Sequence, residues 1–188
     1  MEYQTRTYPE FSACGLNCGL CPRYHTDGTS KCPGCAGVGF SAKHPSCGAL
    51  SCSRRKGLEY CFLCDEYPCK KYKGADLSDS FITHKNQFRD AEKAKQTGLK
   101  TYKTELDEKI RILELLLKNH DDGRHKSFFC TAVNLLDLAD LKSCLKQITN
   151  ETKPETPPKE KSAAAVRALG AMAEKRNISL KLRKAAKL

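Results

Sequence analysis

The sequence predicts a small, metal-stabilised, cysteine-rich N-terminal region, loop-rich and zinc-ribbon-like or knuckle-like, packed on an α-helical bundle. The whole chain would then be mainly α, or α+β. Ten of the twelve cysteines of this 188-residue chain fall within residues 14–69. Beyond residue 100, apolar residues recur at helical spacing. Trp is absent and the aromatic fraction is only 7%, so metal is expected to replace much of the core in the first part of the chain.

The spacing of the cysteines predicts metal ligands. The ten clustered cysteines are Cys14, Cys18, Cys21, Cys32, Cys35, Cys47, Cys52, Cys61, Cys64 and Cys69. A Cys-x2-Cys pair lets the chain turn tightly enough for both thiolates to reach one tetrahedral ion. Two such pairs, Cys18 with Cys21 and Cys32 with Cys35, are therefore predicted to form one four-sulfur site.

A second four-sulfur site is predicted downstream. Cys61 and Cys64 form another pair of the same spacing. Cys47, Cys52 and Cys69 offer the remaining two thiolates, and the spacing does not select between them. Two zinc ions are the cofactors expected for the whole region.

An iron–sulfur cluster is the main alternative to zinc. Cys14-x3-Cys18-x2-Cys21 matches the spacing of the cluster loop of radical S-adenosylmethionine enzymes, but the β/α repeats of their barrel do not follow it. A ferredoxin-like cluster uses the same sulfur ligands and stays open. Two tetrahedral sites leave cysteines over. Either one site is larger than a single ion, or Cys14 and one downstream cysteine are not ligands.

Disulfides and thioredoxin-like redox chemistry are disfavoured. A disulfide framework needs an oxidising compartment, and residues 1–6 open no apolar export signal. The Cys32-Pro33-Gly34-Cys35 segment has the spacing of a redox pair, but no strand–helix–strand pattern surrounds it. Abundant thiols without export predict a reducing cytoplasm.

The composition predicts a soluble protein without membrane contact, because 39% of residues are hydrophobic, 29% are charged and no apolar run approaches the length of a span. The net charge is +11. Residues 159–188 hold nine Lys and Arg against two Glu, a net +7, which leaves +4 for residues 1–158. The basic C-terminal tail is thus a candidate for weak nucleic-acid binding.

Residues 76–150 are predicted to be helical, following a metal-binding module over residues 1–75. A polar segment with capping residues at its start ends before Gly98. Apolar residues then recur at steps of three or four over 106–117, on one face of a helix expected to end near residue 119. An apolar block at 128–136 leads into a further helix, so short turns would join an antiparallel bundle.

Residues 151–161 are proline-rich and are predicted to be a linker. Residues 162–188 would form an alanine-rich helix capped by Ser162, followed by the basic tail. Apolar and polar residues alternate over 178–182, which predicts a short edge strand.

The cysteine-rich region resembles a known family. The matching residues are Cys14-Gly15-Leu16-Asn17-Cys18-Gly19-Leu20-Cys21-Pro22, Lys31-Cys32-Pro33-Gly34-Cys35, Cys47 with Cys52, and Cys61-Phe62-Leu63-Cys64-Asp65-Glu66-Tyr67-Pro68-Cys69. The family is the cysteine-rich, zinc-binding type of domain catalogued as "domain of unknown function 3795". The resemblance covers about the first 75 residues and implies cytoplasmic metal binding, but no reaction.

Few residues outside the cysteine pattern suggest chemistry. Asp121–His125 gathers carboxylates, a guanidinium and an imidazole, although an ordinary turn has the same composition. His25 and His44 are candidate replacements for a thiolate ligand. Cys130 and Cys144 lie in apolar stretches and are expected to be buried as small hydrophobes.

The expected function is a cytoplasmic zinc-binding adaptor or interaction module for a protein or nucleic acid, in which the metal is mainly structural. The alternative is an iron–sulfur or other metal-dependent redox enzyme. No catalytic residue is assigned.

Overall fold

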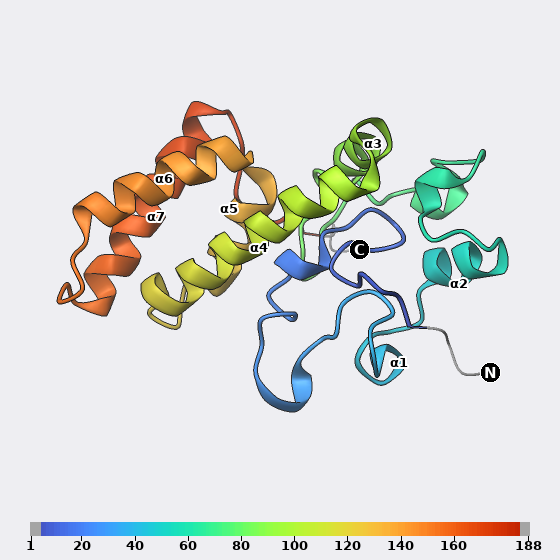
Figure 1. The fold of residues 1–188 in the computed structure, drawn as a ribbon, viewed down its shortest axis with the longest axis horizontal. Coiled ribbons are helices and arrows are strands. Elements are labelled where there is room, and N and C mark those ends of the chain that lie inside the picture. Colours follow the sequence, from blue (N-terminus) through green and yellow to red (C-terminus); the bar gives the residue numbers. More distant parts are fainter. Residues whose placement is uncertain (1–4, 185–188) are drawn as a thin grey trace. The chain divides into compact units, whose positions relative to one another are not determined.

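The computed structural model describes residues 5–184, and within that range every regular element is a helix (Figure 1). The mainly α fold is therefore confirmed, and the strand predicted at 178–182 is wrong, because these residues form an irregular segment. The chain folds into two units. One comprises the residues up to Thr104 together with those from Leu182, and the other comprises Glu105–Lys181. In the described part of the chain, no helix is both long and apolar enough to span a bilayer.

The cysteine-rich part of the first unit consists mostly of loops, as predicted. Its regular elements are short: α1 is Phe40–Lys43, α2 is Gly48–Arg55, and single 3₁₀ turns lie at Cys18–Leu20, Gly28–Ser30, Cys61–Leu63 and Lys70–Tyr72 (Figure 1). Gly39 precedes α1 with φ 75°, a left-handed conformation that glycine adopts without strain. Such short elements bury little apolar area, so the loops need other means of stabilisation.

An aromatic cluster forms the core that supports these loops. Phe11 and Tyr60 are fully buried, with ring centroids 5.3 Å apart. Phe11 also lies 4.7 Å from the ring of Tyr102, at the start of α4, and the ring of Phe62 lies 5.2 Å from that of Tyr60. The Arg6 guanidinium stacks over Tyr60 at 4.5 Å. Residues far apart in the sequence thus meet in one apolar centre.

α3 spans Gln87–Thr97 and α4 spans Leu99–His120, with Gly98 between them at φ 85°. The helix predicted from residue 76 begins only at Gln87. Asp79 does not cap a helix: its carboxylate accepts hydrogen bonds from the backbone N–H groups of His84 and Arg183. The start of this segment is therefore held irregular by a contact from the far end of the chain.

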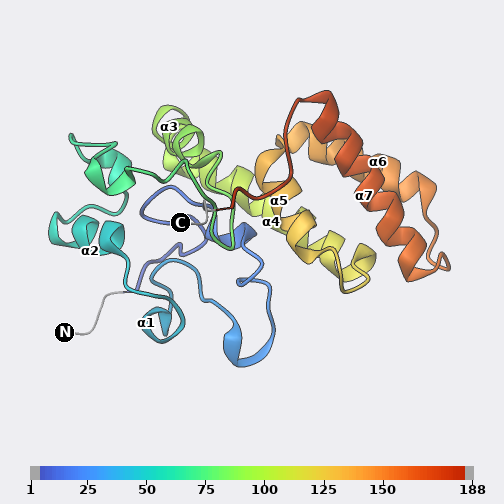
Figure 2. The same cartoon turned by 180° about the vertical axis from the view of Figure 1, so that it is seen from behind.

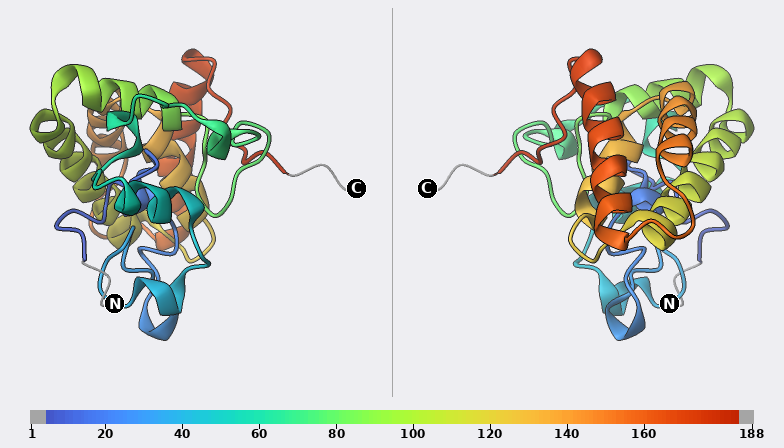
Figure 3. Two further views of the ribbon diagram at one scale, coloured as in Figure 1. Left: turned by 90° about the vertical axis from the view of Figure 1, so that its right-hand side faces the viewer. Right: turned by 90° about the vertical axis from the view of Figure 1, so that its left-hand side faces the viewer.

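The second unit contains most of α4 together with α5 (Lys126–Leu135), α6 (Leu138–Glu151) and α7 (Pro158–Lys175). α6 and α7 lie side by side and antiparallel, as Figures 2 and 3 show from different directions, and α5 also packs on α7. Their contact faces bury apolar side chains, including Leu141, Ile148 and Leu169. The predicted antiparallel bundle is limited to residues 76–150, so the pairing of α6 with α7 across the predicted linker is a finding of the structure.

α7 begins earlier than expected. Pro158 occupies its first turn, where the missing N–H costs nothing, so helix replaces part of the predicted linker. The prediction that Ser162 caps this helix is wrong. Ser162 lies inside the helix, fully buried, with its hydroxyl 3.0 Å from His125 Nδ1. Cys130 and Cys144 are buried as expected.

Candidate metal centres

Four cysteines gather around Cys18 and form with it what we call the inner cysteine group: Cys14, Cys18, Cys21, Cys32 and Cys35. Burial raises the pKa of Cys18 well above its ordinary value, and the charges of the other four members would raise it further. Both Cys-x2-Cys pairs predicted to share a site are therefore neighbours of one sulfur. The four predicted ligands and Cys14 occupy one region of the unit.

Backbone hydrogen bonds bring the two pairs together. The N–H of Cys32 donates to the carbonyl of Arg23 at 2.9 Å, directly after the first pair, and the N–H of Cys35 donates to Pro9 at 2.8 Å. Gly34 fits this contact because its φ is 80° and a Cβ would lie 2.6 Å from the Pro9 carbonyl oxygen. The glycine between the paired cysteines is thus required by close approach of the backbone.

A buried polar network fixes the loop between Cys14 and Cys18. The Asn17 side-chain amide donates to Asp90 of α3 at 2.7 Å, and its oxygen accepts from the Tyr102 hydroxyl at 2.8 Å. Asn86 donates to the same Asp90 carboxylate. Every member of this network is buried, so the loop is held on α3 and α4 by directional bonds.

Hydrogen-bond donors face the sulfurs of the inner cysteine group. Burial raises the pKa of Cys21, while hydrogen bonds from the backbone of Arg23 and Tyr24 act to lower it. Burial likewise raises the pKa of Cys35, against a backbone hydrogen bond from Ala13 and the nearby positive charge of Arg6. N–H groups directed at sulfur soften the charge of metal-bound thiolates.

Cys14 is the fifth member of the inner cysteine group. Burial raises the pKa of Cys14 to about 11, and the Ser12 hydroxyl, 3.1 Å from its sulfur, acts in the opposite direction. The charges of Cys35 and Cys47 would raise it further. Cys14 is therefore a neighbour of the predicted four-sulfur set.

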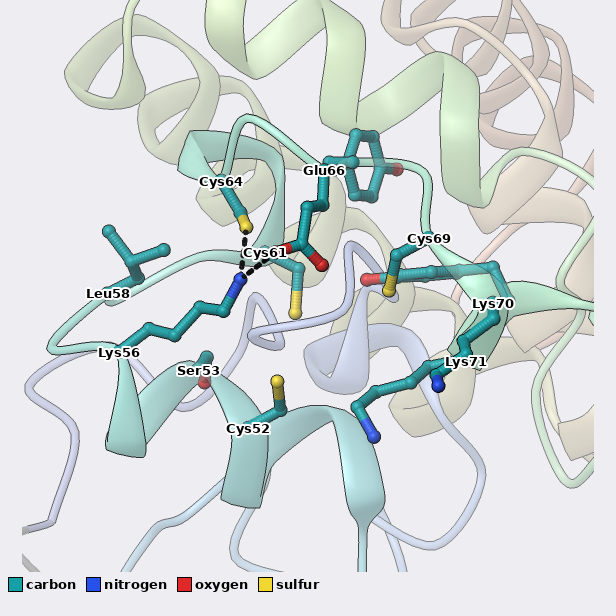
Figure 4. Close-up of a pocket in the computed structure, with 12 residues that line it drawn as sticks. Cys52, Ser53, Lys56, Leu58, Cys61, Cys64, Glu66, Cys69, Lys70 and Lys71 are labelled. Atoms are coloured by element: carbon teal, nitrogen blue, oxygen red, sulfur yellow. Dashed lines mark hydrogen bonds and ion pairs between the residues drawn. The ribbon is translucent and has the colours of Figure 1, made fainter.

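Four other cysteines line one pocket of about 380 Å³ (Figure 4), and we call them the pocket cysteines: Cys52, Cys61, Cys64 and Cys69. Cys52 comes from α2, while Cys61 belongs to a 3₁₀ turn that Cys64 follows directly. Figure 4 shows the sulfurs of Cys52 and Cys61 pointing toward one another. The structure thus brings both Cys52 and Cys69 to the Cys61–Cys64 pair, a choice that the spacing left open.

Cys47 lies between the two sets. Its charge would raise the pKa of Cys14 and Cys35 on one side and of Cys61 on the other. For Cys61, burial is the largest cause of the raised pKa, and a hydrogen bond from Tyr72 opposes it. Cys47 is therefore near members of both sets, and the Tyr72 hydroxyl also donates to the backbone carbonyl of Cys14 at 3.3 Å.

Lys56 contacts a pocket cysteine, although the cysteine pattern gives no reason to expect it. Its ammonium group donates to the sulfur of Cys64 at 3.3 Å and to the Glu66 carboxylate at 2.7 Å (Figure 4). These contacts raise the pKa of Lys56 and lower that of Glu66. The basic cluster Arg54-Arg55-Lys56 was visible in the sequence, but only the fold aims one of its members at a thiol.

The chemistry of the donor set fits a thiophilic metal. Both sets consist of sulfur donors, and N–H or ammonium groups lie beside several of them. In the described range, 5–184, no three His, Cys, Asp or Glu side chains are yet close enough together to hold an ion. Within these described residues, neither the inner cysteine group nor the pocket cysteines are therefore arranged as a formed ion site.

The two candidate histidines are engaged elsewhere. His25 Nε2 lies 2.7 Å from the carbonyl oxygen of Gly19. His44 Nδ1 lies 2.8 Å from the Pro45 carbonyl oxygen, and its ring stacks on Phe40 with centroids 4.6 Å apart. Both rings are thus held by backbone or aromatic contacts.

The Asp121–His125 segment forms a hydrogen-bonded turn. Asp121 accepts from the backbone N–H groups of Gly123 and His125, as aspartate does in ordinary turns. Asp122 and Ser162 both approach the same nitrogen, Nδ1 of His125, each at 3.0 Å. In a nucleophilic triad, the serine and the aspartate contact opposite ring nitrogens of the histidine. Two partners on the same nitrogen therefore do not form such a triad.

Comparison with known proteins identifies the cysteine-rich region. No curated protein and no solved structure matches the chain. A family model described as "Protein of unknown function (DUF3795)" matches residues 10–74, which include all ten clustered cysteines. The resemblance predicted from the cysteine motifs is thereby confirmed for residues 10–74, the part of the chain that the DUF3795 family model matches.

Proposed function

We propose that this protein is a cytoplasmic zinc-binding protein whose two ions are mainly structural and whose folded N-terminal unit serves as an interaction module. The inner cysteine group would hold one ion through Cys18, Cys21, Cys32 and Cys35. The pocket cysteines would hold the other. When bound, zinc would crosslink segments of the chain without redox chemistry.

The observation that carries this proposal is the composition of the inner region. Around Cys35 the buried residues are Ala13, Ala36 and Leu50, with Cys18 and Cys47 packed against them. Burial of a large apolar side chain such as leucine stabilises a fold by about 1.5–3 kcal/mol, and burial of alanine contributes less. This cluster therefore supplies little hydrophobic stabilisation. Structural zinc supplies about 10 kcal/mol or more in small modules. The loops of this region are thus of the kind that metal stabilises.

Closed four-thiolate sites favour a binding role over catalysis. A catalytic zinc keeps one position for water or substrate, whereas four protein sulfurs fill a tetrahedral ion. The partner would be a protein or, more weakly, a nucleic acid. Three arginines of the C-terminal part pair with carboxylates, namely Arg167 with Glu151, Arg176 with Asp140 and Arg183 with Asp79. Nucleic-acid contact would therefore fall to the remaining lysines.

A second candidate function is an iron–sulfur or metal-dependent redox enzyme. The observation that favours it is the number of sulfurs in the inner cysteine group. One zinc ion needs four thiolates, and Cys14 is a fifth. An iron–sulfur cluster would use the same ligand type. Cys14 is the residue whose role separates the two candidates.

Purification without oxygen, followed by elemental analysis and a visible absorption spectrum, tests both candidates. The expected result is about two zinc ions per chain and no sulfur-to-iron charge-transfer band. Replacement of Cys14 by Ser is expected to leave the zinc content unchanged. A brown protein that contains iron and acid-labile sulfide, and loses both in Cys14→Ser, would overturn the proposal and establish the second candidate.

A further inference from the structure

The inner cysteine group and the pocket cysteines differ in how deeply their surroundings are buried. In the inner cysteine group, the residues that flank Cys14, Cys18 and Cys35 are all buried, whereas Cys32 follows the exposed Lys31. Among the pocket cysteines, Cys64 and Cys69 have exposed residues on both sides, including Leu63, Asp65 and Lys70, whereas Cys61 lies between the buried Tyr60 and Phe62. Solvent and small solutes can therefore reach the pocket without any part of the aromatic core opening.

The charge around the pocket suits an ion held by thiolates. One divalent ion with four thiolates carries a net charge of about −2. Lys56, Lys70 and Lys71 line the pocket, and Glu66 is the one carboxylate among its described lining residues. Figure 4 shows Lys56 on one side and Lys71 on the other. The lining thus carries a positive excess that offsets such a centre.

Lys56 makes the most specific of these contacts. Its ammonium group is shared between the sulfur of Cys64 and the carboxylate of Glu66. An ammonium beside a ligand sulfur stabilises the thiolate by charge and by an N–H···S hydrogen bond. Glu66 competes for the same ammonium group, so the strength of the contact with Cys64 depends on both partners.

We propose that the pocket cysteines form an exchangeable site for a thiophilic divalent ion, Zn²⁺, and that Lys56 is its positioning residue. The inner cysteine group keeps its ion, while the pocket ion is released to and recovered from solution. This inference rests on the proposed zinc-binding function. It adds that the two ions differ in their rates of exchange with solution.

The test uses the full-length protein loaded with zinc and a coloured chelator that reports released metal. We expect two phases: a fast phase of about one ion per chain from the pocket, and a slow phase of about one ion from the inner cysteine group. Cys69→Ser should remove the fast phase and keep the slow one. Native mass spectrometry before and after the fast phase counts the ions that remain.

Lys56→Met should weaken binding of the fast ion by about tenfold and leave the slow phase unchanged, because outer-shell partners of metal ligands commonly contribute about 10–100-fold to affinity. Lys56→Arg should restore affinity. Lys71→Met, in the same pocket, is the matched control and should change affinity much less. Glu66→Gln provides an independent variant, since freeing Lys56 from its competitor should slow release.

Equal release rates for both ions would overturn the exchangeable site. A fast phase unaltered in both Lys56→Met and Glu66→Gln would overturn the role of Lys56. If Lys56→Met loses its folded circular dichroism signal, Glu66→Gln decides alone. A protein isolated with no zinc at all would instead refute the proposed function, so the two failures are distinguishable.

Discussion

Arg183 and Asp79, 104 positions apart in the sequence, form an ion pair in which both carboxylate oxygens of Asp79 accept hydrogen bonds. Arg183 donates to Oδ1 of Asp79 from its guanidinium at 2.8 Å and to Oδ2 from its backbone N–H at 2.7 Å. The backbone N–H of Asp79 in turn donates to the Arg183 carbonyl at 2.9 Å. The Asp79 side chain is completely buried. Arg183 is thus held within the first unit by the segment that precedes α3.

Arg183→Ala should destabilise the protein by about 2 kcal/mol, because it leaves the buried Asp79 carboxylate without its charged partner. The free energy of unfolding in urea measures this effect. Lys184→Ala, at the exposed neighbouring position, is the control and is expected to change stability by less than about 0.5 kcal/mol. Equal effects of both variants would contradict the anchoring role.

The same pair predicts a dependence of stability on pH. Burial acts to raise the pKa of Asp79, but hydrogen bonds from Arg183 and His84 outweigh it, so the pKa is lowered. A lowered folded-state pKa gives stability that is complete above the unfolded value, about 3.9, and is lost as pH falls through the folded value. The difference in unfolding free energy between the wild type and Asp79→Asn should therefore be constant near neutral pH and shrink below about pH 4. A difference independent of pH would show that the carboxylate charge is not involved.

Cys32→Ser should lower the zinc content by about one ion per chain and unfold the N-terminal loops, because it removes one of the proposed inner ligands. Far-ultraviolet circular dichroism should change little, since the second unit holds most of the helix. Elemental analysis and limited proteolysis follow the two effects. Cys144→Ala removes a buried thiol of the second unit and should keep the full metal content. A Cys32→Ser protein with unchanged zinc would show that the assignment of Cys32 is incorrect.

Asp140→Asn should destabilise the second unit by about 1 kcal/mol. Arg176 donates to both carboxylate oxygens of Asp140, at 2.8 and 2.6 Å, and this contact lowers the pKa of Asp140. The expected effect is small because the Arg176 side chain is 52% exposed and screened by solvent. Thermal unfolding of Asp140→Asn can be compared with that of Glu155→Gln, an exposed carboxylate in the α6–α7 connection. Identical midpoints in the two variants would exclude a contribution from the pair.

If the basic C-terminal part contacts nucleic acid, Lys159→Glu combined with Lys184→Glu should weaken binding of a labelled oligonucleotide. The plot of log affinity against log salt concentration should also become less steep. Its slope should change by about 0.7 for each phosphate of a single-stranded oligonucleotide that the protein no longer neutralises. Fluorescence anisotropy over a range of salt concentrations measures both. The matched charge reversal Lys95→Glu with Lys118→Glu tests general charge effects. Equal weakening in both double variants would show that the tail is not a specific binding surface.

The sequence by itself determined the local chemistry of this protein. Cys-x2-Cys spacing identifies tight turns that present paired thiols, because both ends of such a turn lie within a few residues. Apolar periodicity likewise predicted α4 and α6, since a helix repeats every 3.6 residues along the chain. The family resemblance of residues 10–74 rested on the same local motifs.

Only the tertiary structure decided which local pieces meet. It grouped Cys52 and Cys69 with the Cys61–Cys64 pair, left Cys47 between the two sets, and directed Lys56 at Cys64. It also replaced the predicted tail strand with the contact between Arg183 and Asp79. These outcomes depend on burial and on hydrogen bonds between distant residues, such as that between Asn17 and Asp90, and spacing along the chain carries no information about such contacts.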